Sequence, residues 1–400
     1  MIGKVYQRII LLGALVFLSF IGVYTFDASL KTTAHKLHKR DYREEISINT
    51  PFIVPKLHQP ACLKPVDDIV FVKTHKTGSS TLQNIFRRYG LKNNLEIAMP
   101  VNDGNRFEYP YFFKSTFMKQ NQFNLKPKII ANHLRASPEL YETFPNAKRI
   151  TILRDIPSLY ESSFSYFRGF SRPYRNAKSL EIFFASPKRF FNSAEPYGNK
   201  GNDIFARNHM AFDLGMPWLS ENNEENILKA LEQTFHLVLI TDYFPESMVL
   251  LKNELCWEWD DVVFFVTNQR SEKAPLSQEI ELQMKKWNSL DNAIFNHFNA
   301  TFWRKIENCE NFEEDLKVLN IKLEEVKKTC LKENFKCAEN DPDCSKTEDY
   351  FDVKIKKFEL SEGGKKLELC RLMVMTELEM TGKIYQKQWP GWYELYDGRV

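Results

Sequence analysis

The sequence predicts an α/β fold in which a mainly parallel central sheet is flanked by helices. Five short apolar runs are each followed by polar or helix-like sequence, and this alternation is typical of strands joined through helices. The predicted strands are residues 69–73, 128–132, 149–153, 237–241 and 262–266. A chain of 400 residues that is 43% hydrophobic can bury the core of one large domain of this kind, or of two smaller ones.

The segments between and after these strands differ in character. Residues 106–117 and 164–191 are rich in Tyr, Phe and Arg, and we expect them to form long loops around a mouth. Residues 307–332 have the pattern of a charged amphipathic helix, residues 333–348 that of a polar loop, and residues 382–400 form an aromatic tail. The net charge of +3 comes without a long basic run, so we expect no nucleic-acid partner.

The most informative segment is Lys73-Thr74-His75-Lys76-Thr77-Gly78-Ser79-Ser80-Thr81, directly after the first predicted strand. Leu82, Ile85 and Phe86 recur at helical spacing, so the segment joins a strand to a helix N-terminus. Backbone N–H groups, the helix dipole and a flexible glycine make such a turn a cradle for an anion. A nucleoside-triphosphate loop places its lysine after the glycines, whereas Lys76 precedes Gly78. The order indicates a different phosphate-containing ligand.

This segment resembles the 5′-phosphosulfate loop of sulfotransferases, in particular that of the galactose 3-O-sulfotransferase family. The resemblance extends from about Cys62 to Glu307 and is carried by residues 132–135, 235–239, 255–258 and 297–305. It implies a P-loop-like sulfotransferase fold and 3′-phosphoadenosine 5′-phosphosulfate (PAPS) as co-substrate, with no metal required. It also implies that the sulfonate and 5′-phosphate bind to Lys76, Thr77, Gly78, Ser79, Ser80 and Thr81.

The same resemblance predicts a second phosphate site after the third strand. In sulfotransferases an Arg, and a Ser eight residues later, bind the 3′-phosphate of the donor. Arg154 follows the strand at residues 149–153, Pro157 suits a first helical turn, and Ser162 lies eight residues after Arg154. Arg can hold a phosphate through two parallel hydrogen bonds. We therefore expect Arg154 and Ser162 to complete the donor site.

Sulfonate transfer also needs a base that takes the proton of the acceptor hydroxyl, and histidine is suited to this near neutral pH. His75 lies within the phosphate loop, and His133 follows the second predicted strand at the same edge of the sheet. Either could be the base while the other orients the sugar, with Lys76 stabilising the charge on the leaving oxygen. His209 is a third candidate, and a carboxylate remains an alternative. Six aromatic side chains are candidates to stack on the sugar: Tyr109, Tyr111, Phe112, Tyr166, Phe167 and Trp257.

The resemblance predicts transfer of the sulfonate of PAPS to the 3-hydroxyl of a terminal β-galactose. The acceptor is a glycolipid such as galactosylceramide, giving sulfatide, or a glycoprotein glycan. One alternative is a Golgi carbohydrate sulfotransferase with a different acceptor sugar, and another is a lumenal nucleotide- or glycan-binding protein without catalysis. A homodimer is left open. Asp341-Pro342-Asp343 has the spacing of a glycosyltransferase metal motif, but no strand precedes it, and we assign it no metal role.

Residues 9–26 form an apolar stretch of about eighteen residues, near the lower limit for a membrane span. No small-residue cleavage pattern follows, which favours an uncleaved signal anchor. Lys4 and Arg8 precede the stretch and Lys31, Lys36, Lys39 and Arg40 follow it, so a simple count of positive charges favours the opposite orientation, with the domain in the cytosol. The family resemblance implies a type II Golgi membrane protein: cytosolic residues 1–8, anchor 9–26, stem 27–61 and a lumenal domain 62–400, with a helical, cysteine-bearing extension from about residue 307.

Two further features fit a lumenal domain. Asn299-Ala300-Thr301 is a glycosylation sequon, whereas Asn49-Thr50-Pro51 has no acceptor hydroxyl in its third position. The seven cysteines do not have zinc-site spacing, and in an oxidising lumen some of them should pair. An odd count leaves at least one outside an intramolecular disulfide. The family resemblance provides no counterpart for Cys309, which makes Cys309 our candidate. Their connectivity cannot be deduced from spacing.

Overall fold

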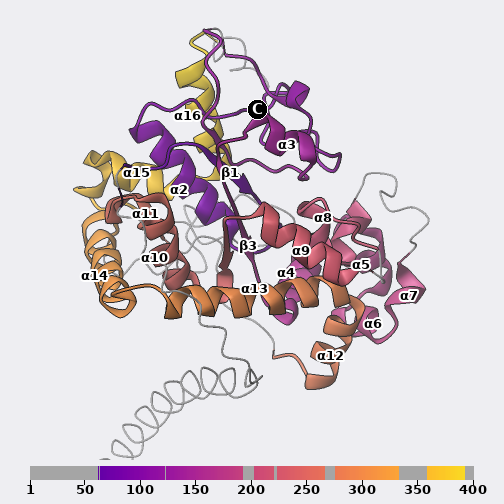
Figure 1. The fold of residues 1–400 in the computed structure, drawn as a ribbon. Helices are drawn as coiled ribbons and strands as arrows, with labels where there is room; N and C mark the ends of the chain where they lie inside the picture. Colours follow the sequence, from indigo (N-terminus) through magenta and orange to yellow (C-terminus); the bar gives the residue numbers. More distant parts are fainter. Residues whose placement is uncertain are drawn as a thin grey trace, which may run out of the picture. The chain divides into compact units, whose positions relative to one another are not determined.

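Four parallel strands form the centre of the domain (Figure 1). The computed structural model describes residues 62, 64–121, 123–191, 202–219, 223–265, 275–332 and 358–391, all within one compact unit, Gln59–Val400. The strands are β1 (Ile69–Val72), β2 (Ile129–Ile130), β3 (Lys148–Leu153) and β4 (Leu237–Ile240), in the order β2-β1-β3-β4. The α/β class and four of the five predicted strands are confirmed.

The sheet is buried because its strands are apolar on both faces, as expected for a parallel sheet. All residues of β1, β2 and β4 are buried, and so are the last four of β3. Ile69 pairs with Ile129 on one side and with Lys148 on the other, and Ile150 pairs with Leu237. This register brings the carboxyl ends of the strands to a common edge.

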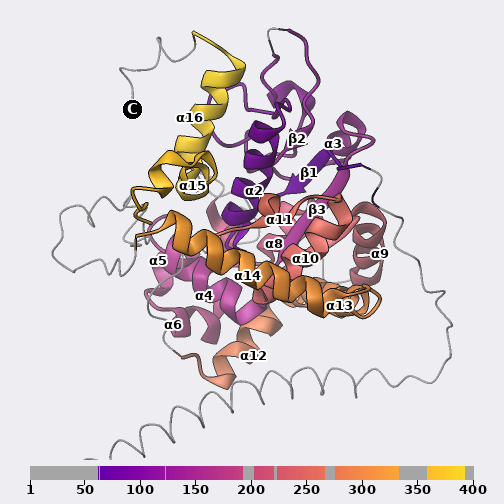
Figure 2. The same cartoon turned by 90° about the vertical axis from the view of Figure 1, so that its left-hand side faces the viewer.

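Helices surround the sheet (Figures 1 and 2). Helices α10 and α13 contact β4, and α2 contacts β2. The α-helices are α2 (Ser79–Lys92), α3 (Pro138–Thr143), α4 (Ile156–Phe167), α5 (Arg172–Ala177), α6 (Leu180–Ala185), α7 (Pro187–Phe190), α8 (His209–Asp213), α9 (Glu224–Thr234), α10 (Phe244–Leu255), α11 (Trp259–Val262), α12 (Gln278–Trp287), α13 (Ser289–Glu307), α14 (Phe312–Cys330), α15 (Glu368–Val374) and α16 (Glu377–Gln388). The 3₁₀-helices are η1 (Ser115–Phe117), η2 (Asn202–Ala206), η3 (Thr241–Tyr243) and η4 (Gly364–Lys366).

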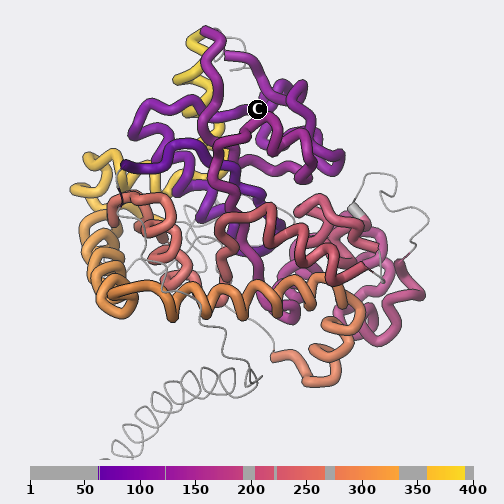
Figure 3. Tube along the Cα trace, viewed as in Figure 1, coloured from indigo at the N-terminus to yellow at the C-terminus, as the bar shows by residue number. Residues whose placement is uncertain are grey.

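The last described helices return to the first part of the domain. Both α15 and α16 pack against α2, so the yellow end of the trace lies beside its indigo beginning (Figure 3). Helix α16 begins with a capping box in which Thr376 Oγ1 accepts from the N–H of Glu379 and the Glu379 carboxylate accepts from the N–H of Thr376. The box fixes the start of α16 and therefore the position of Glu377 in its first turn.

Three sequence-based expectations about these elements are wrong. Residues 262–265, the described part of the strand expected at residues 262–266, form no strand: α11 ends at Val262, and Arg88 Nη2 donates to the carbonyl oxygen of Val263 (2.6 Å), which takes the place of a ladder hydrogen bond. The expected loop at residues 164–191 contains the end of α4 and the short helices α5, α6 and α7. The expected aromatic tail from residue 382 begins inside α16. In the first case an apolar run packs as an extended segment, which periodicity cannot tell from a strand.

The amphipathic helix predicted at residues 307–332 is confirmed as α14, and the loop expected at residues 106–117 contains only the short η1. Within the described ranges no helix is long and apolar enough to cross a membrane. The predicted anchor at residues 9–26, the stem, the sequence Asp341-Pro342-Asp343 and the cysteines Cys337 and Cys344 lie outside the described residues.

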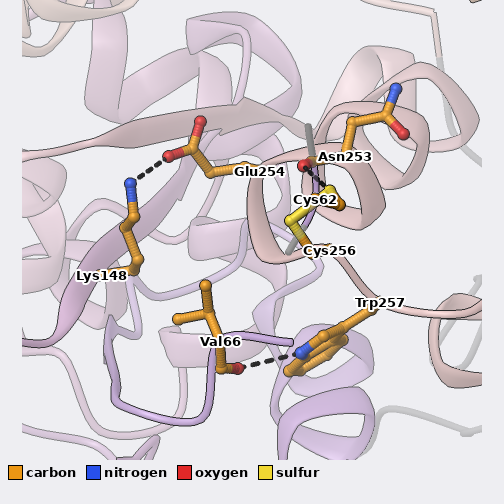
Figure 4. The surroundings of a disulfide bond; sticks show 7 residues. All are labelled: Cys62, Val66, Lys148, Asn253, Glu254, Cys256 and Trp257. Carbon is orange, nitrogen blue, oxygen red and sulfur yellow. Dashed lines mark hydrogen bonds and ion pairs between the residues drawn. A yellow bond between two sulfur atoms is a disulfide. The ribbon is translucent and has the colours of Figure 1, made fainter. Parts of the chain in front are cut away.

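Two disulfides link distant segments. Cys62 is bonded to Cys256 just after α10, next to the hydrogen bond from Trp257 Nε1 to the carbonyl oxygen of Val66 (Figure 4). Cys330 at the end of α14 is bonded to Cys370 in α15. Cys309 forms no disulfide with these four cysteines, and its sulfur accepts a hydrogen bond from Asn253 Nδ2.

Candidate active site

The segment after β1 is held in shape by its own hydroxyl groups. Thr77 Oγ1 donates to the carbonyl oxygen of Thr74 (3.0 Å), and Ser79 Oγ donates to the same oxygen (2.6 Å). Thr74 Oγ1 contacts Thr77 Oγ1 at 2.8 Å and donates to the carbonyl oxygen of Ile152 on β3. Each hydroxyl has one proton to donate, so Thr77 and Ser79 would have to reorient to bind a phosphate. Their role as phosphate ligands stays a prediction.

The N-terminus of α2 has the properties of an anion cradle. Gly78 caps the helix with a φ of 69°, in the left-handed region that glycine adopts without strain. No side chain caps the helix and its first turn holds no acidic residue. The first N–H groups of a helix lack intrahelical partners, and the helix dipole favours negative charge there. Ser80 and Thr81 lie in this first turn and remain predicted ligands.

Arg154 joins this segment to the end of β3. Its Nη1 donates to the carbonyl oxygen of Lys76 (2.9 Å), and Thr241, after β4, reaches the carbonyl oxygens of Thr77 and Leu153. Ser162 is buried in α4, which begins two residues after Arg154. The loop and Arg154, taken from two separate strands, are therefore in contact at the carboxyl edge of the sheet, where α/β proteins bind ligands.

Lys76 is held by its backbone and by an aromatic ring. Its φ of 61° is uncommon for a residue other than glycine, and such conformations gather at functional sites. Its ammonium lies 3.8 Å from the ring centroid of Tyr166 on α4. This cation–π contact fixes a positive charge beside the helix N-terminus, against the preference of the dipole. An anionic ligand at this position would offset the cost.

His75 forms a pair with a buried carboxylate. Both its backbone N–H (2.8 Å) and its Nδ1 (2.9 Å) contact Oδ2 of Asp213, which ends α8. The Tyr109 hydroxyl donates to Oδ1 of Asp213 at 2.8 Å. With the carboxylate accepting from Nδ1–H, the lone pair of His75 lies on Nε2. This is the arrangement in which an acid orients a histidine for proton abstraction.

His133 is placed in a different environment. Its Nε2 lies 2.9 Å from Nζ of Lys73, and the same Nζ donates to Oε2 of Glu377 at 2.8 Å. Burial lowers the pKa of His133 well below its usual value, and Lys73 and His75 lower it further. Burial also lowers the pKa of Lys73, whereas Glu377 raises it. His133 is therefore neutral, with Nε2 accepting from Lys73 and Nδ1 carrying the proton.

The two histidines lie face to face. Their ring centroids are 4.5 Å apart with an interplanar angle of 23°, so the sequence-based expectation that both sit at one edge is confirmed. His209 lies apart from this pair in function: it is fully buried, and burial lowers its pKa to about 3. Neither ring nitrogen of His209 has a hydrogen-bond partner among the described residues. These properties make His209 a poor base.

The candidate sugar-stacking aromatics form two groups: rings that stack on another ring of the domain, and rings that lie near the histidines or are exposed. Trp257 is buried and stacks on Tyr89 at 3.7 Å, which makes it a core residue. Phe167 stacks on Phe205, also at 3.7 Å. The remaining candidates lie near the histidines or are exposed, as Tyr111 and Phe112 are. Tyr109 packs on His75 with ring centroids 4.8 Å apart, and the ring of Tyr166 makes the cation–π contact with the ammonium of Lys76.

Sequence reasoning missed three residues of the site: Lys73, Asp213 and Glu377. Lys73 ends the first predicted strand, where its position predicts no role, whereas Lys76 lies beside the glycine of the loop. Asp213 stands 138 residues after His75, and Glu377 stands 304 residues after Lys73. No local pattern links residues so far apart, and only the fold brings them together.

Asn299 lies within α13, and only 3% of its surface is exposed. Thr301, the third residue of the sequon, donates its hydroxyl to the carbonyl oxygen of His297 in the preceding helical turn. A glycan on Asn299 would therefore have to be added before α13 packs against the domain. Glycosylation at this position stays a prediction.

Comparison with known proteins decides the family. The sequence model of galactose-3-O-sulfotransferases matches residues 3–388. The chain belongs to the galactose-3-O-sulfotransferase family. It is 32% identical over 379 residues to galactose-3-O-sulfotransferase 2 of Mus musculus, covering 86% of this chain and 90% of the relative. It is 40% identical over 281 residues to galactosylceramide sulfotransferase of Bos taurus, covering 67% of this chain and 65% of the relative. The family resemblance is confirmed.

Membership of this family makes the protein a carbohydrate sulfotransferase. Such an enzyme needs a sulfate donor as co-substrate. The residues of the site are consistent with an anionic donor, because a helix N-terminus, Lys76 and Arg154 lie together with no acidic residue in the first turn of α2.

Proposed function

We propose that this enzyme transfers the sulfonate group of PAPS to the 3-hydroxyl of a terminal β-galactose. The observation that supports this most is the contact between Arg154 and the loop carrying Lys76. A donor with two phosphates needs two cationic sites at a fixed separation, and this contact joins the two segments that carry them. Arg154 and Ser162 would hold the 3′-phosphate, while Lys76 and the first turn of α2 would hold the 5′-phosphate and sulfonate.

We assign the base to His75. Its Nε2 takes the proton of the acceptor hydroxyl while the hydroxyl oxygen forms a bond to sulfur. The bond from sulfur to the bridging oxygen breaks, and the electron pair stays on that oxygen, where Lys76 stabilises it. The products are the 3-O-sulfated sugar and adenosine 3′,5′-bisphosphate. Asp213 orients His75 and stabilises its protonated form.

The acceptor is a galactose-terminated glycolipid or glycan. The relatives' names include both galactosylceramide sulfotransferase and galactose-3-O-sulfotransferase, so the proposal includes both classes of acceptor. Tyr111 and Phe112 are exposed in the loop whose Tyr109 packs on His75, and we assign their rings to the sugar.

Radiolabelled PAPS offered with galactosylceramide, lactosylceramide and N-acetyllactosamine tests the proposal. We expect label on at least one of the three, and none on the matching acceptor whose galactose lacks the 3-hydroxyl. Label on the 3-deoxy acceptor would place the reaction at another hydroxyl. No transfer to any galactose acceptor, with transfer to a glucuronate-terminated chain, would favour the alternative acceptor class.

We also propose that the catalytic domain lies in the Golgi lumen and is attached to the membrane through the anchor at residues 9–26. The two disulfides support this, because the cytosol keeps such cysteines reduced. Since Asn299 is buried, the test needs an exposed sequon: Glu225→Thr puts a hydroxyl residue two positions after exposed Asn223.

In animal cells the full-length Glu225→Thr chain should gain a glycan that glycosidase removes, and it should resist carbonate extraction. Asn299→Gln in the same chain reports whether Asn299 is also used. The domain should resist protease in intact vesicles until detergent is added. A chain that is unglycosylated, thiol-reactive and cleaved in intact vesicles would show a cytosolic domain.

A further inference from the structure

The C-terminal helix α16 supplies the carboxylate at the centre of a buried group of cations. Glu377 Oε2 accepts from Lys73 Nζ (2.8 Å), and Oε1 accepts from Asn105 Nδ2 (3.1 Å). Lys73 is only 1% exposed, and its Nζ also lies 2.9 Å from His133 Nε2. The chain of contacts thus runs from α16 through the end of β1 to a histidine stacked on His75.

The charges that surround this chain are mainly positive. Lys73 and His133 interact with Arg87 of α2, with Arg106 of the loop before η1 and, for His133, with His75. Arg87 Nη1 donates to the carbonyl oxygen of Glu377 (3.1 Å) and Nη2 donates to Asn132 (2.7 Å). Glu377 is the carboxylate that interacts with both Lys73 and Arg87. Buried cations are costly without such a partner.

We propose that Glu377 is a positioning residue for sulfonate transfer: it holds Lys73 in place so that Lys73 fixes the orientation and tautomer of His133 beside His75. This inference rests on the proposed function. Lys73 donates to Nε2 of His133, so Nε2 cannot serve as a base, and the proton of His133 stays on Nδ1. Nδ1 is buried without a hydrogen-bond partner among the described residues. The ring of His133 is thereby held in one orientation and one tautomer against the ring of His75.

This role makes the active site depend on the docking of the C-terminal helices. The Cys330–Cys370 disulfide ties α15 to α14, and Asn84 Nδ2 of α2 donates to the carbonyl oxygen of Leu372 (2.9 Å). A Cβ on Gly364 would lie 2.3 Å from the carbonyl oxygen of Cys330, so the chain passes closely there. These contacts hold α15 and α16 against α2 and so place Glu377 beside Lys73.

The test compares Glu377→Gln with Glu379→Gln in the full-length enzyme. Gln at position 379 can still accept from the N–H of Thr376, so the capping box and the fold are kept. We expect Glu377→Gln to lower kcat about 100-fold, the cost of a small misplacement at a reacting centre. The KM for PAPS should change little. Without Glu377 the pKa of Lys73 falls, so the alkaline limb of the kcat profile should move to lower pH.

A double-mutant cycle with Lys73→Met separates positioning from a structural effect. If Glu377 acts through Lys73, Glu377→Gln should cause no further loss of kcat in the Lys73→Met background. Glu377→Asp, which keeps the charge, should restore part of the activity. A wild-type kcat and pH profile in Glu377→Gln, or an equal loss in both backgrounds, would overturn the inference.

A second measurement does not depend on activity. The measurement is the ¹⁵N NMR spectrum of enzyme labelled at histidine, in which the signals of His133 are identified by their loss in His133→Gln. These spectra should show an unprotonated Nε2 of His133 in the wild type and in Glu379→Gln. Both Glu377→Gln and Lys73→Met should release this tautomer preference. If the wild type transfers no sulfonate to galactose but these spectra change as expected, the proposed function fails and the positioning role stands. Unchanged spectra in both variants would reject that role.

Discussion

Replacing Lys76 or Arg154 with alanine should lower sulfonate transfer by roughly 30- to 1,000-fold while the domain stays folded. Loss of one charged contact to a phosphate or to the leaving oxygen costs about 2–4 kcal/mol, and each 1.36 kcal/mol is a factor of ten. Lys76 contacts Tyr166 through its ammonium, and Arg154 contacts the Lys76 carbonyl, so neither side chain belongs to the apolar core.

The two variants should differ in whether kcat or nucleotide affinity is reduced more. Lys76→Ala should lower kcat more than donor affinity, since its charge acts on the leaving oxygen. Arg154→Ala should weaken binding of adenosine 3′,5′-bisphosphate, which calorimetry measures, and Arg154→Lys should restore it only in part because lysine lacks the planar fork. Matched controls are the exposed Lys229→Ala and Arg175→Ala. Wild-type turnover and nucleotide affinity in both folded variants would remove Lys76 and Arg154 from the donor site.

The sequence could predict the parts of this fold that depend on local pattern. Four strands, the loop after β1 and helix α14 follow from apolar runs, turn residues and helical spacing. The proposed phosphate loop can be predicted from the sequence because its residues are consecutive. Arg154 was found through the family resemblance, and its contact with Lys76 supports the two-site donor prediction.

What the sequence could not predict depends on contacts between distant segments. Asp213 looks like any acid at the end of a short helix until the fold places it 2.9 Å from His75 Nδ1. Glu377 belongs to a helix whose pattern predicts only an amphipathic surface. The apolar composition of residues 262–266 predicts a strand, but Val263 and Phe265 pack in an extended segment against Cys330 and Cys370, and such a segment has the same composition as a strand. In each case the tertiary contact, and not the local propensity, decides the outcome.

These contacts also change the choice of base. From sequence, His133 and His75 were comparable candidates. In the structure the lone pair of His133 Nε2 is directed at Lys73, and burial, followed by the surrounding cations, lowers the pKa of His133 and disfavours its protonation. His75 has a carboxylate on Nδ1 and leaves Nε2 for the acceptor. A base must gain a proton during the reaction, so the histidine next to an anion is better suited than the one next to a cation.

His75→Ala should therefore lower kcat by about 10²–10⁴-fold, the usual contribution of a positioned base. Binding of adenosine 3′,5′-bisphosphate should be kept, because the ring of His75 faces Asp213, Tyr109 and His133 rather than the N-terminus of α2. The residual rate of the variant should lose the acidic limb that protonation of the base gives to the wild-type kcat profile.

Asp213→Asn supplies the matched test of orientation. It keeps the size of the side chain but removes the charge that holds Nδ1–H, so kcat should fall with little effect on donor binding. Tyr109→Phe, which removes a single hydrogen bond to Asp213 Oδ1, should have a much smaller effect. His133→Ala should also lower kcat, yet keep the acidic limb. If instead His133→Ala removes that limb and His75→Ala keeps it, the two histidines exchange roles, and full activity in both variants would exclude histidine as the base.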